Sequence, residues 1–286
     1  LGQTLAVRLI YHDEFVARLT ENAGLDAFSG GVLVPTMGGL HEGHLELVRA
    51  AKSLGRPVVV SVFVNPDQFN DQDDFAGYPR RFELDAGLAE SAGADVVWGP
   101  TQQDIYPNGF EVPTPDLPSV ATKPGLEDAH RPGHFAGVAR VVQRLFDLVQ
   151  PQVAVFGEKD WQQLQLVQAM VDRDGGPRIH AVPTSREADG LARSSRNERL
   201  TEVSRPKARA VYLALQAAAA ANHPSTAEKM MRETLETHGL KVEYAVVRSA
   251  TGLRPVNDFS RPSRALVAAW LDGVRLIDNL PMPVWT

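Results

Sequence analysis

Short apolar runs alternate with helical patterns through the first two-thirds of the chain, and this alternation restricts the fold more than any other feature. The runs are mostly continuous, as strands covered on both faces of a parallel sheet are. They lie at 31–34, 58–64, 95–98, 153–156 and 179–182. Apolar residues at helical spacing lie between them at 43–54, 83–92 and 135–149. The sequence therefore predicts an α/β fold with a Rossmann-like, doubly wound parallel sheet.

The pattern changes near residue 184, where two helical stretches are followed by three short strand-like runs. This order predicts a smaller α+β module. The 286 residues allow about two domains at ~150 residues each. We expect a Rossmann-like domain over residues 1–183 and a C-terminal α+β domain over residues 184–286. The Pro-, Gly- and Asp-rich stretch 99–134 is long for a simple connection, and it is therefore expected to be functional or mobile.

Composition excludes several classes of protein and site. The chain has no cysteine, which excludes a disulfide scaffold, a thiolate nucleophile and a zinc site with sulfur ligands. Its net charge of −6 argues against bulk binding of nucleic acid. No apolar run approaches the ~18 residues that span a bilayer, and the first residues do not resemble a signal peptide. We expect a cytoplasmic protein that binds neither membranes nor nucleic acid.

The segment 35–44, Pro-Thr-Met-Gly-Gly-Leu-His-Glu-Gly-His, leaves the first predicted strand and opens a helix. Backbone amides at a helix start, with glycines that let a ligand approach closely, form an anion site. His41 and His44 lie three apart in that first turn, so both can donate hydrogen bonds to a phosphate. The alternative is a tight turn whose histidines only cap or pack. The His-x-Gly-His pattern at the change from strand to helix favours a functional site.

Two further polar segments suit phosphate groups. Phe-Gly-Glu-Lys-Asp at 156–160 follows the fourth predicted strand, and Lys159 there can neutralise phosphate charge. The alternative is a solvated charge cluster at a helix start. Arg-Ser-Ser-Arg-Asn at 193–197 combines hydroxyl groups, guanidinium groups and turn amides. The alternative for this segment is a polar interdomain loop.

A pair of glutamines can hold a small polar acid. Gln68 follows the second predicted strand, and Gln163 lies on the helix after Lys159. Amides bind hydroxyl and carboxylate groups without adding charge, although either glutamine alone is typical of a surface position. Three of the four sites follow strand ends, which share one edge of a parallel sheet. We therefore expect these sites to act together.

Taken together, these residues resemble the pantoate–β-alanine ligase family over essentially the whole chain. The His-x-Gly-His element alone marks a wider nucleotidyltransferase superfamily, but its combination with Gly-Glu-Lys-Asp-x-Gln-Gln and Ser-Ser-Arg-Asn is highly specific. The shared stretches are Pro-Thr-Met-Gly…His-Glu-Gly-His at 35–44, Phe-Val-Asn-Pro-Asp-Gln-Phe at 63–69, Tyr-Pro-Arg at 78–80, Arg-Pro-Gly-His-Phe-Ala-Gly-Val at 131–138, Phe-Gly-Glu-Lys-Asp-Trp-Gln-Gln-Leu at 156–164, Ser-Ser-Arg-Asn at 194–197 and Arg-Leu-Ile-Asp-Asn at 275–279.

The resemblance implies a two-step reaction. The carboxylate of pantoate attacks the α-phosphate of ATP, which gives pantoyl adenylate and pyrophosphate. The amine of β-alanine then attacks the mixed anhydride, which gives pantothenate and AMP. The resemblance also implies Mg²⁺ carried with ATP and a homodimer. It implies that domain 1–183 binds nucleotide and pantoate, and that domain 184–286 acts as a lid.

Carried over position by position, the resemblance also implies roles for single residues. His44 matches the family's proton-donor histidine, and His41 is its companion. We expect both, with Lys159, Arg196 and Mg²⁺, to stabilise the departing pyrophosphate. Gln68 also lies near β-alanine. The pantoate-binding residues are Gln68 and Gln163. The ATP-binding residues are Met37, Gly38, Gly39, Leu40, His41, Glu42, Gly43, His44, Gly157, Glu158, Lys159, Asp160, Ser185, Arg193, Ser194, Ser195 and Arg196.

The chain departs from the family pattern at several positions. Arg140 replaces a usual Thr on the helix after Arg-Pro-Gly-His, and no reason is visible in the sequence. Arg193 stands where Met or Leu is usual, and Ser185 stands where Val is usual. The acidic pair that often follows Tyr-Pro-Arg is reduced to Glu83 and Asp85. This weakens the case for a protein carboxylate on the metal and leaves Asp85 as the candidate.

Two other functions remain open from the sequence. Another adenylyl- or cytidylyltransferase of the same superfamily would share the His-x-Gly-His and Ser-Ser-Arg elements, but it does not need paired glutamines. A regulatory nucleotide-binding module without turnover would lack phosphate-contacting side chains, and none of the central ones is missing. The negative charge and the lack of an appended anticodon-binding region argue against a tRNA synthetase.

Overall fold

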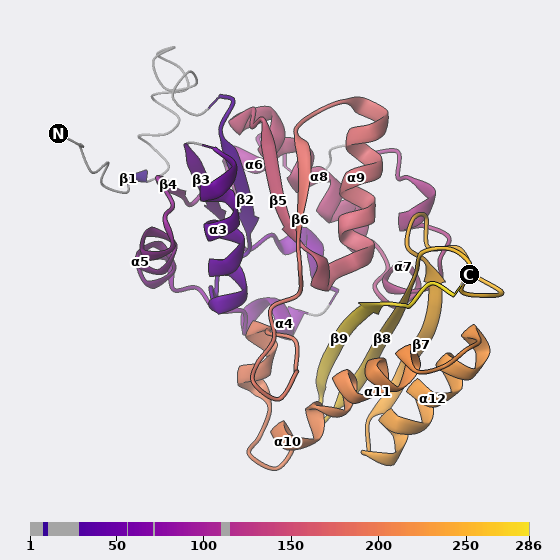
Figure 1. The fold of residues 1–286 in the computed structure, drawn as a ribbon. Coiled ribbons are helices and arrows are strands. Elements are labelled where there is room, and N and C mark those ends of the chain that lie inside the picture. The colour runs from indigo at the N-terminus through magenta and orange to yellow at the C-terminus, as the bar shows by residue number, and fades with distance from the viewer. Residues whose placement is uncertain (1–7, 11–28, 56, 71, 110–114, 286) are drawn as a thin grey trace. The chain divides into compact units, whose positions relative to one another are not determined.

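The computed structural model describes residues 8–10, 29–55, 57–70, 72–109 and 115–285. The chain divides into two compact units (Figure 1). The first unit comprises Leu1–Glu158 and Leu166–Val182, and the second comprises Lys159–Gln165 and Pro183–Thr286.

The first unit is built on a six-stranded parallel sheet with the order β1-β4-β3-β2-β5-β6. From β2 the chain passes to β3 and β4 toward one edge, and from β5 it passes to β6 at the other edge. The winding therefore reverses between the neighbours β2 and β5, the position where doubly wound sheets bind ligands. The strands are β1 (Arg8–Ile10), β2 (Val32–Thr36), β3 (Val58–Val62), β4 (Val96–Trp98), β5 (Val153–Gly157) and β6 (Arg178–Val182).

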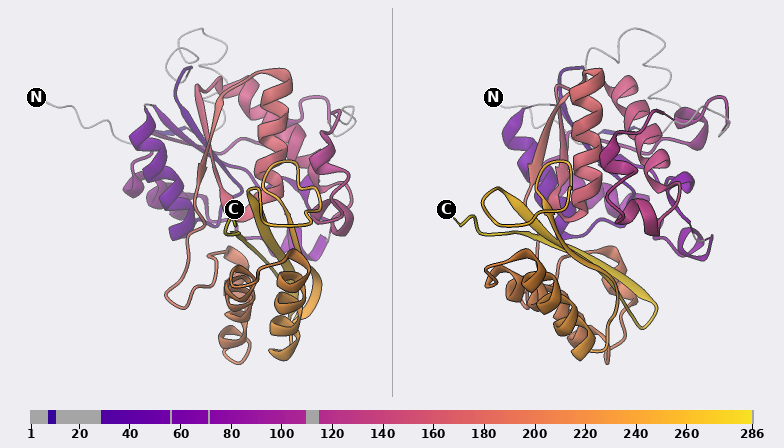
Figure 2. Two further views of the ribbon diagram at one scale, coloured as in Figure 1. Left: turned by 45° about the vertical axis from the view of Figure 1, so that its right-hand side comes forward. Right: turned by 90° about the vertical axis from the view of Figure 1, so that its right-hand side faces the viewer.

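Helices cover both faces of this sheet because successive strand side chains point to opposite faces. Val32 and Val34 of β2 pack in one cluster with apolar residues of α3 and α5, and these two helices lie on one side of the sheet (Figures 1 and 2). The helix α8 lies on the other side, where it contacts β2. The α-helices of this part of the chain are α3 (Glu42–Leu54), α4 (Gln72–Ala76), α5 (Phe82–Ala92), α6 (Gln102–Ile105), α7 (Glu127–His130), α8 (His134–Val149) and α9 (Trp161–Asp174).

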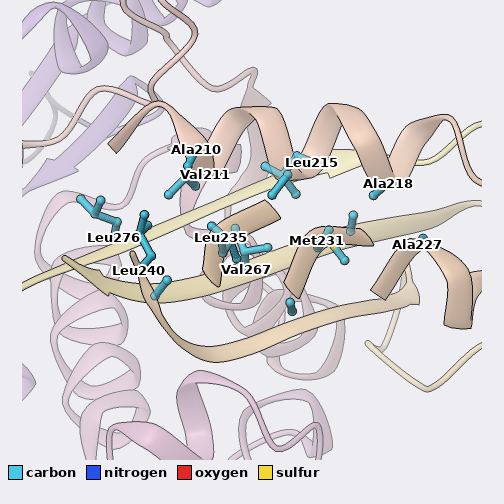
Figure 3. Packing of buried hydrophobic residues seen from close by; sticks show 14 of the residues in the cluster. Ala210, Val211, Leu215, Ala218, Ala227, Met231, Leu235, Leu240, Val267 and Leu276 are labelled. Atoms are coloured by element: carbon cyan, nitrogen blue, oxygen red, sulfur yellow. The ribbon is translucent and has the colours of Figure 1, made fainter. Parts of the chain in front are cut away.

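The second unit has a three-stranded antiparallel sheet with the order β7-β8-β9. The helices α11 and α12 lie side by side on one face of that sheet (Figure 2). Small and branched apolar side chains, such as Ala218, Leu215 and Val267, fill the space between helices and sheet (Figure 3). The elements are α10 (Arg205–Ala208), α11 (Ala210–Ala219), α12 (Pro224–Thr237), β7 (Lys241–Ser249), β8 (Ser263–Leu271) and β9 (Val274–Pro281).

The predicted fold class is confirmed, with two differences in detail. The strand β1 was not predicted, because three residues are too few to show a pattern. The stretch 99–134 is partly helical, with α6, α7 and the 3₁₀-helix η2 (Ser119–Ala121), while residues 110–114 lie outside the described part. Among the described residues, no helix is both long and apolar enough to cross a membrane.

Gly137 and Gly87 form a matched pair for testing how closely α8 packs. A Cβ on Gly137 would overlap the backbone carbonyl of Asp67, whereas a Cβ on Gly87 would contact nothing within 4 Å. We predict that Gly137→Ala lowers the free energy of unfolding by about 1–3 kcal/mol through overpacking. Gly87→Ala should raise it by about 0.5–1 kcal/mol, because alanine favours the helix. Urea unfolding followed by circular dichroism measures both, and equal stabilities would contradict the close approach of α8 to residue 67.

Candidate active site

The turn after β2 takes its shape from two glycines. Gly38 and Gly39 have φ angles of +84° and +61°, in the left-handed region that favours glycine. A Cβ on Gly38 would also lie only 3.0 Å from Oδ2 of Asp85. The Gly38 amide donates to Oγ1 of Thr36 at 3.3 Å. Both conformation and close approach therefore require glycine at position 38.

The two histidines of this turn cap α3 and have a defined tautomer. Nδ1 of His41 accepts from the amide of Gly43 at 3.1 Å, and Nδ1 of His44 accepts from the amide of His41 at 3.3 Å. An amide N–H can only donate, so each neutral ring carries its proton on Nε2. The ring centroids are 4.1 Å apart. The histidines thus do cap the helix, as the alternative interpretation expects, and each also has an Nε2–H donor.

Asp85 reaches this turn from α5. Its Oδ2 accepts from the amide of Gly39 at 2.9 Å and its Oδ1 from the amide of Leu40 at 2.8 Å. The residue is 1% exposed, so the carboxylate faces the protein backbone. Within the described ranges, no three or more His, Cys, Asp or Glu side chains form a group that could hold a metal ion. The two amide bonds give Asp85 a structural role in the turn, and its role as a metal ligand stays a prediction.

The segment that carries Gln68 follows β3 and is docked on the start of α8. The carbonyl oxygen of Gln68 accepts from Nη2 of Arg131 at 3.1 Å and from Nδ1 of His134 at 3.0 Å. Because a carbonyl only accepts, the His134 proton is on Nδ1, and Nε2 accepts from Arg131 at 3.0 Å. The side chain of Asn65 donates to the carbonyl of Gly137 at 3.2 Å. The Arg-Pro-Gly-His motif therefore holds the backbone of Gln68 (η1, Pro66–Gln68).

Arg140 has a partner in the same segment. Its Nη2 lies 2.6 Å from Oδ2 of Asp67, and the two side chains are only 15% and 22% exposed. Nearby, Tyr106 donates its hydroxyl to Oδ1 of Asn65 at 2.8 Å, and burial raises the pKa of Tyr106. Arg140 thus neutralises a carboxylate next to Gln68, which explains the arginine on this helix.

The side-chain amides of both candidate glutamines lack hydrogen bonds within the part of the chain that the structure describes. Gln68 is 7% exposed, and Gln163 is partly buried on α9. In contrast, Gln168 of the same helix donates to Asp172 at 2.8 Å. The side-chain amide of Gln68 is therefore available to bond to a ligand.

Lys159 follows β5 by two residues and is held within the second unit. Its carbonyl accepts from Nδ2 of Asn279 at 2.9 Å, and its ammonium lies 3.6 Å from Asp160. Asp278 is fully buried and accepts two hydrogen bonds from Arg186, at 2.6 and 3.0 Å. Burial raises the pKa of Asp278, while Arg186 and Lys159 oppose that shift. The Arg-Leu-Ile-Asp-Asn motif on β9 therefore holds the backbone of Lys159 through Asn279 and places Asp278 within electrostatic range of Lys159.

The serine- and arginine-rich loop lies in the same unit. Ser194 begins the 3₁₀-helix η4 (Ser195–Arg199), and its Oγ accepts from the amide of Arg196 at 3.3 Å. The amide of Arg193 donates to the carbonyl of Ser185 at 2.9 Å. The strand β9 contacts η4, so it touches both this loop and, through Asn279, the residue Lys159.

A network of charged side chains braces this loop. Asn197 donates to Oε1 of Glu187 at 3.0 Å, and Arg205 bonds to both Glu187 and Asp189 at 2.7 Å. The Arg205 hydrogen bond lowers the pKa of Asp189. None of these three charged residues was singled out from the sequence, because no local pattern connects Arg205 to partners sixteen and eighteen residues away.

Each unit thus gathers a subset of the predicted residues. In the first unit, segment 37–44, Gln68 and Gly157 follow the neighbouring strands β2, β3 and β5. In the second unit, Lys159 lies four residues before Gln163, and Ser185 bonds to the loop 193–196. The first set lies at the edge of the sheet where the winding reverses, which is where a nucleotide binds in this architecture.

Comparisons with known proteins agree with this arrangement. The family model described as pantoate-beta-alanine ligase matches residues 16–281. A pantothenate synthetase of Thioalkalivibrio sulfidiphilus is 45% identical over 258 residues, covering 87% of this chain and 89% of that relative. One of Paracoccus denitrificans is 48% identical over 259 residues, with the same coverages.

Solved structures lead to the same family. Pantothenate synthetase from Thermus thermophilus superposes with a TM-score of 0.88 at 41% identity, over 96% of this chain and 99% of that one. Pantoate-beta-alanine ligase from Francisella tularensis, complexed with beta-gamma ATP and beta-alanine, gives 0.79 at 32% identity, over 96% and 97%. The chain described here belongs to the pantoate–β-alanine ligase family.

Proposed function

We propose that this chain condenses (R)-pantoate with β-alanine to pantothenate through a pantoyl-adenylate intermediate, with release of AMP and pyrophosphate. The main support is Gln68, a buried residue whose side-chain amide makes no hydrogen bond among the described residues. It follows the strand next to the one that leads into the His-x-Gly-His turn. A small polar acid held there would lie near ATP phosphates on that turn.

In the first step, the pantoate carboxylate forms a bond to the α-phosphorus of ATP while the bond to pyrophosphate breaks. The carboxylate is already ionised at pH 7, so the protein needs to position it rather than deprotonate it. Negative charge grows on the departing pyrophosphate. We assign its stabilisation to the Nε2–H groups of His41 and His44 and to the cations of Lys159 and Arg196.

In the second step, the neutral amine of β-alanine attacks the acyl carbon, the bond from that carbon to the AMP oxygen breaks, and the nitrogen releases a proton. Gln68 and Gln163 hold pantoate, and Gln68 also lies near β-alanine. Support comes from the related Francisella tularensis enzyme, whose structure is described as complexed with beta-gamma ATP and beta-alanine. We extend the ATP contacts to the segments 37–44, 157–160 and 193–196 and to Ser185.

Mg²⁺ accompanies ATP in this proposal, and its ligands are the phosphate oxygens. Asp85 is the candidate carboxylate for this ion, and each of its oxygens already accepts one hydrogen bond from a backbone amide. When bound, the ion would neutralise phosphate charge. We also propose a homodimer in the cytoplasm, with residues 1–183 binding nucleotide and pantoate and residues 184–286 acting as a lid.

Exchange of labelled pyrophosphate into ATP tests the reaction class. We predict exchange that requires pantoate and does not require β-alanine. Exchange without pantoate would favour another nucleotidyltransferase of the superfamily. Nucleotide binding without any exchange would favour a regulatory module.

Gln68→Ala and Gln163→Ala should each raise the KM for pantoate about fivefold, because a hydrogen bond of about 1 kcal/mol is lost in the bound state. The KM for ATP should change little. Gln168→Ala is the matched control, since its amide is already bonded to Asp172. Steady-state kinetics with each substrate varied measures both constants, and a change confined to ATP would place the acid elsewhere.

Lys159→Met should slow adenylate formation about tenfold or more, because one partly desolvated charge is removed from the leaving group. Methionine keeps most of the apolar stem, so the change tests charge rather than shape. The second step should suffer less, since pyrophosphate has already left. Single turnovers started from ATP plus pantoate, or from preformed adenylate plus β-alanine, separate the steps.

The control for this variant is Lys207→Met, an exposed lysine of the second unit. Its rates should match those of the unmodified chain. Equal losses in both steps for Lys159→Met would mean that Lys159 positions the whole adenylate and has no special role toward the leaving group.

A further inference from the structure

Asp85 accepts hydrogen bonds from two backbone amides of the His-x-Gly-His turn. It lies 45 and 46 residues along the chain from Leu40 and Gly39, and its two oxygens accept from those two successive amides at 2.8 and 2.9 Å. Hydrogen bonds from amides to a carboxylate are stronger than those to a neutral acceptor. The turn before α3 is therefore held by an internal anion.

The position of the Asp85 carboxylate and the conformation of Gly38 and Gly39 depend on each other. Gly38 and Gly39 both have positive φ angles, which turns the amides of Gly39 and Leu40 toward α5. The space beside Gly38 is closed by Oδ2 of Asp85 at 3.0 Å and by Cγ1 of Val62 at 3.1 Å from a Cβ placed there. The turn thus has little freedom while the carboxylate is in place.

The hydrogen bonds of His41 and His44 depend on the conformation of this turn. Leu40 precedes His41, whose amide donates to Nδ1 of His44, while Nδ1 of His41 accepts from Gly43. Both bonds require the backbone at 40 and 41 to keep its direction. The tautomer that leaves the proton on Nε2 of each ring therefore depends on where Asp85 holds the turn.

We propose that Asp85 is a positioning residue: it takes the Gly39 and Leu40 amides and so fixes His41 and His44 as paired Nε2–H donors. The imidazoles of the turn then bind the phosphates of the nucleotide, and those two amides do not. The catalytic consequence rests on the proposed function, whereas the amide bonds and the tautomers can be tested without any substrate.

The first test uses the unmodified protein and amide hydrogen exchange. The amides of Gly39 and Leu40 should exchange slowly even though they lie in a turn, because both are buried and bonded to a carboxylate. Fast exchange of both amides would overturn the proposal. This measurement needs no variant, so it decides even if a substitution at position 85 prevents folding.

The second test compares Asp85→Asn with Glu83→Gln, which removes the same charge from an exposed position on the same helical turn. In protein labelled with ¹⁵N-histidine, NMR reports the tautomer of each ring, and His41→Gln and His44→Gln assign the signals. We expect fixed Nε2–H tautomers in the unmodified chain and in Glu83→Gln, and mixed tautomers in Asp85→Asn. Unchanged tautomers in Asp85→Asn would contradict the role assigned to Asp85.

Kinetics supply the third readout. Asp85→Asn should lower the rate of adenylate formation at least about tenfold with less than about twofold change in the KM for ATP, because aligned donors act mainly in the transition state. The dependence on free Mg²⁺ should keep its midpoint. A shifted midpoint with the rate restored at high Mg²⁺ would make Asp85 a metal ligand instead. Absence of adenylate formation in every form, with fixed tautomers in the unmodified chain, would refute the proposed function and leave the positioning role intact.

Discussion

Parallel hydrogen bonding of β2 to β3 on one side and to β5 on the other is the constraint on which the first unit depends. Parallel pairing makes all three strands end at one edge, and the reversal of winding between β2 and β5 keeps their following turns from being covered by crossover helices. The His-x-Gly-His turn, Gln68 and Gly157 each follow one of these strands. Their proximity is therefore a property of the sheet, and each turn needs only local features to orient its own side chains.

Those local features are hydrogen bonds through which a backbone group determines which nitrogen of a histidine ring carries the proton. Backbone amides set the proton of His41 and His44 on Nε2, while a backbone carbonyl sets the proton of His134 on Nδ1. The first arrangement leaves an Nε2–H donor on each ring, which the proposed function assigns to the leaving pyrophosphate. The second yields a donor that holds the segment of Gln68. In the second unit, Asn279 and Asp278 similarly fix the backbone and the electrostatic surroundings of Lys159. In the proposed function, these donors and cations stabilise the leaving pyrophosphate, and the first step needs no protein base because the carboxylate of pantoate is already ionised.

The sequence predicted the parts of this arrangement that are local. The strand runs, the helix patterns and the glycine turn are each visible within about ten residues, and the doubly wound sheet follows from their order. What could not be predicted joins distant residues: Asp85 with the amides at 39 and 40, and Arg140 with Asp67. From the sequence alone, Asp85 could be assigned only as a candidate metal ligand. No reason was visible for Arg140 in place of threonine. The strand β1 could not be predicted for a different reason, because its three residues are too few to show a pattern.

In the adenylate pathway, the carboxylate of pantoate becomes bonded to the α-phosphate of ATP before the amide forms. Pantoate labelled with ¹⁸O in both carboxylate oxygens tests for this bond, with AMP analysed by mass spectrometry after complete turnover. The oxygen that bridges carbon and phosphorus in the adenylate stays with phosphorus when β-alanine attacks the acyl carbon. We predict one ¹⁸O in each AMP formed and none in pyrophosphate. Unlabelled AMP alongside newly formed pantothenate would contradict the adenylate pathway.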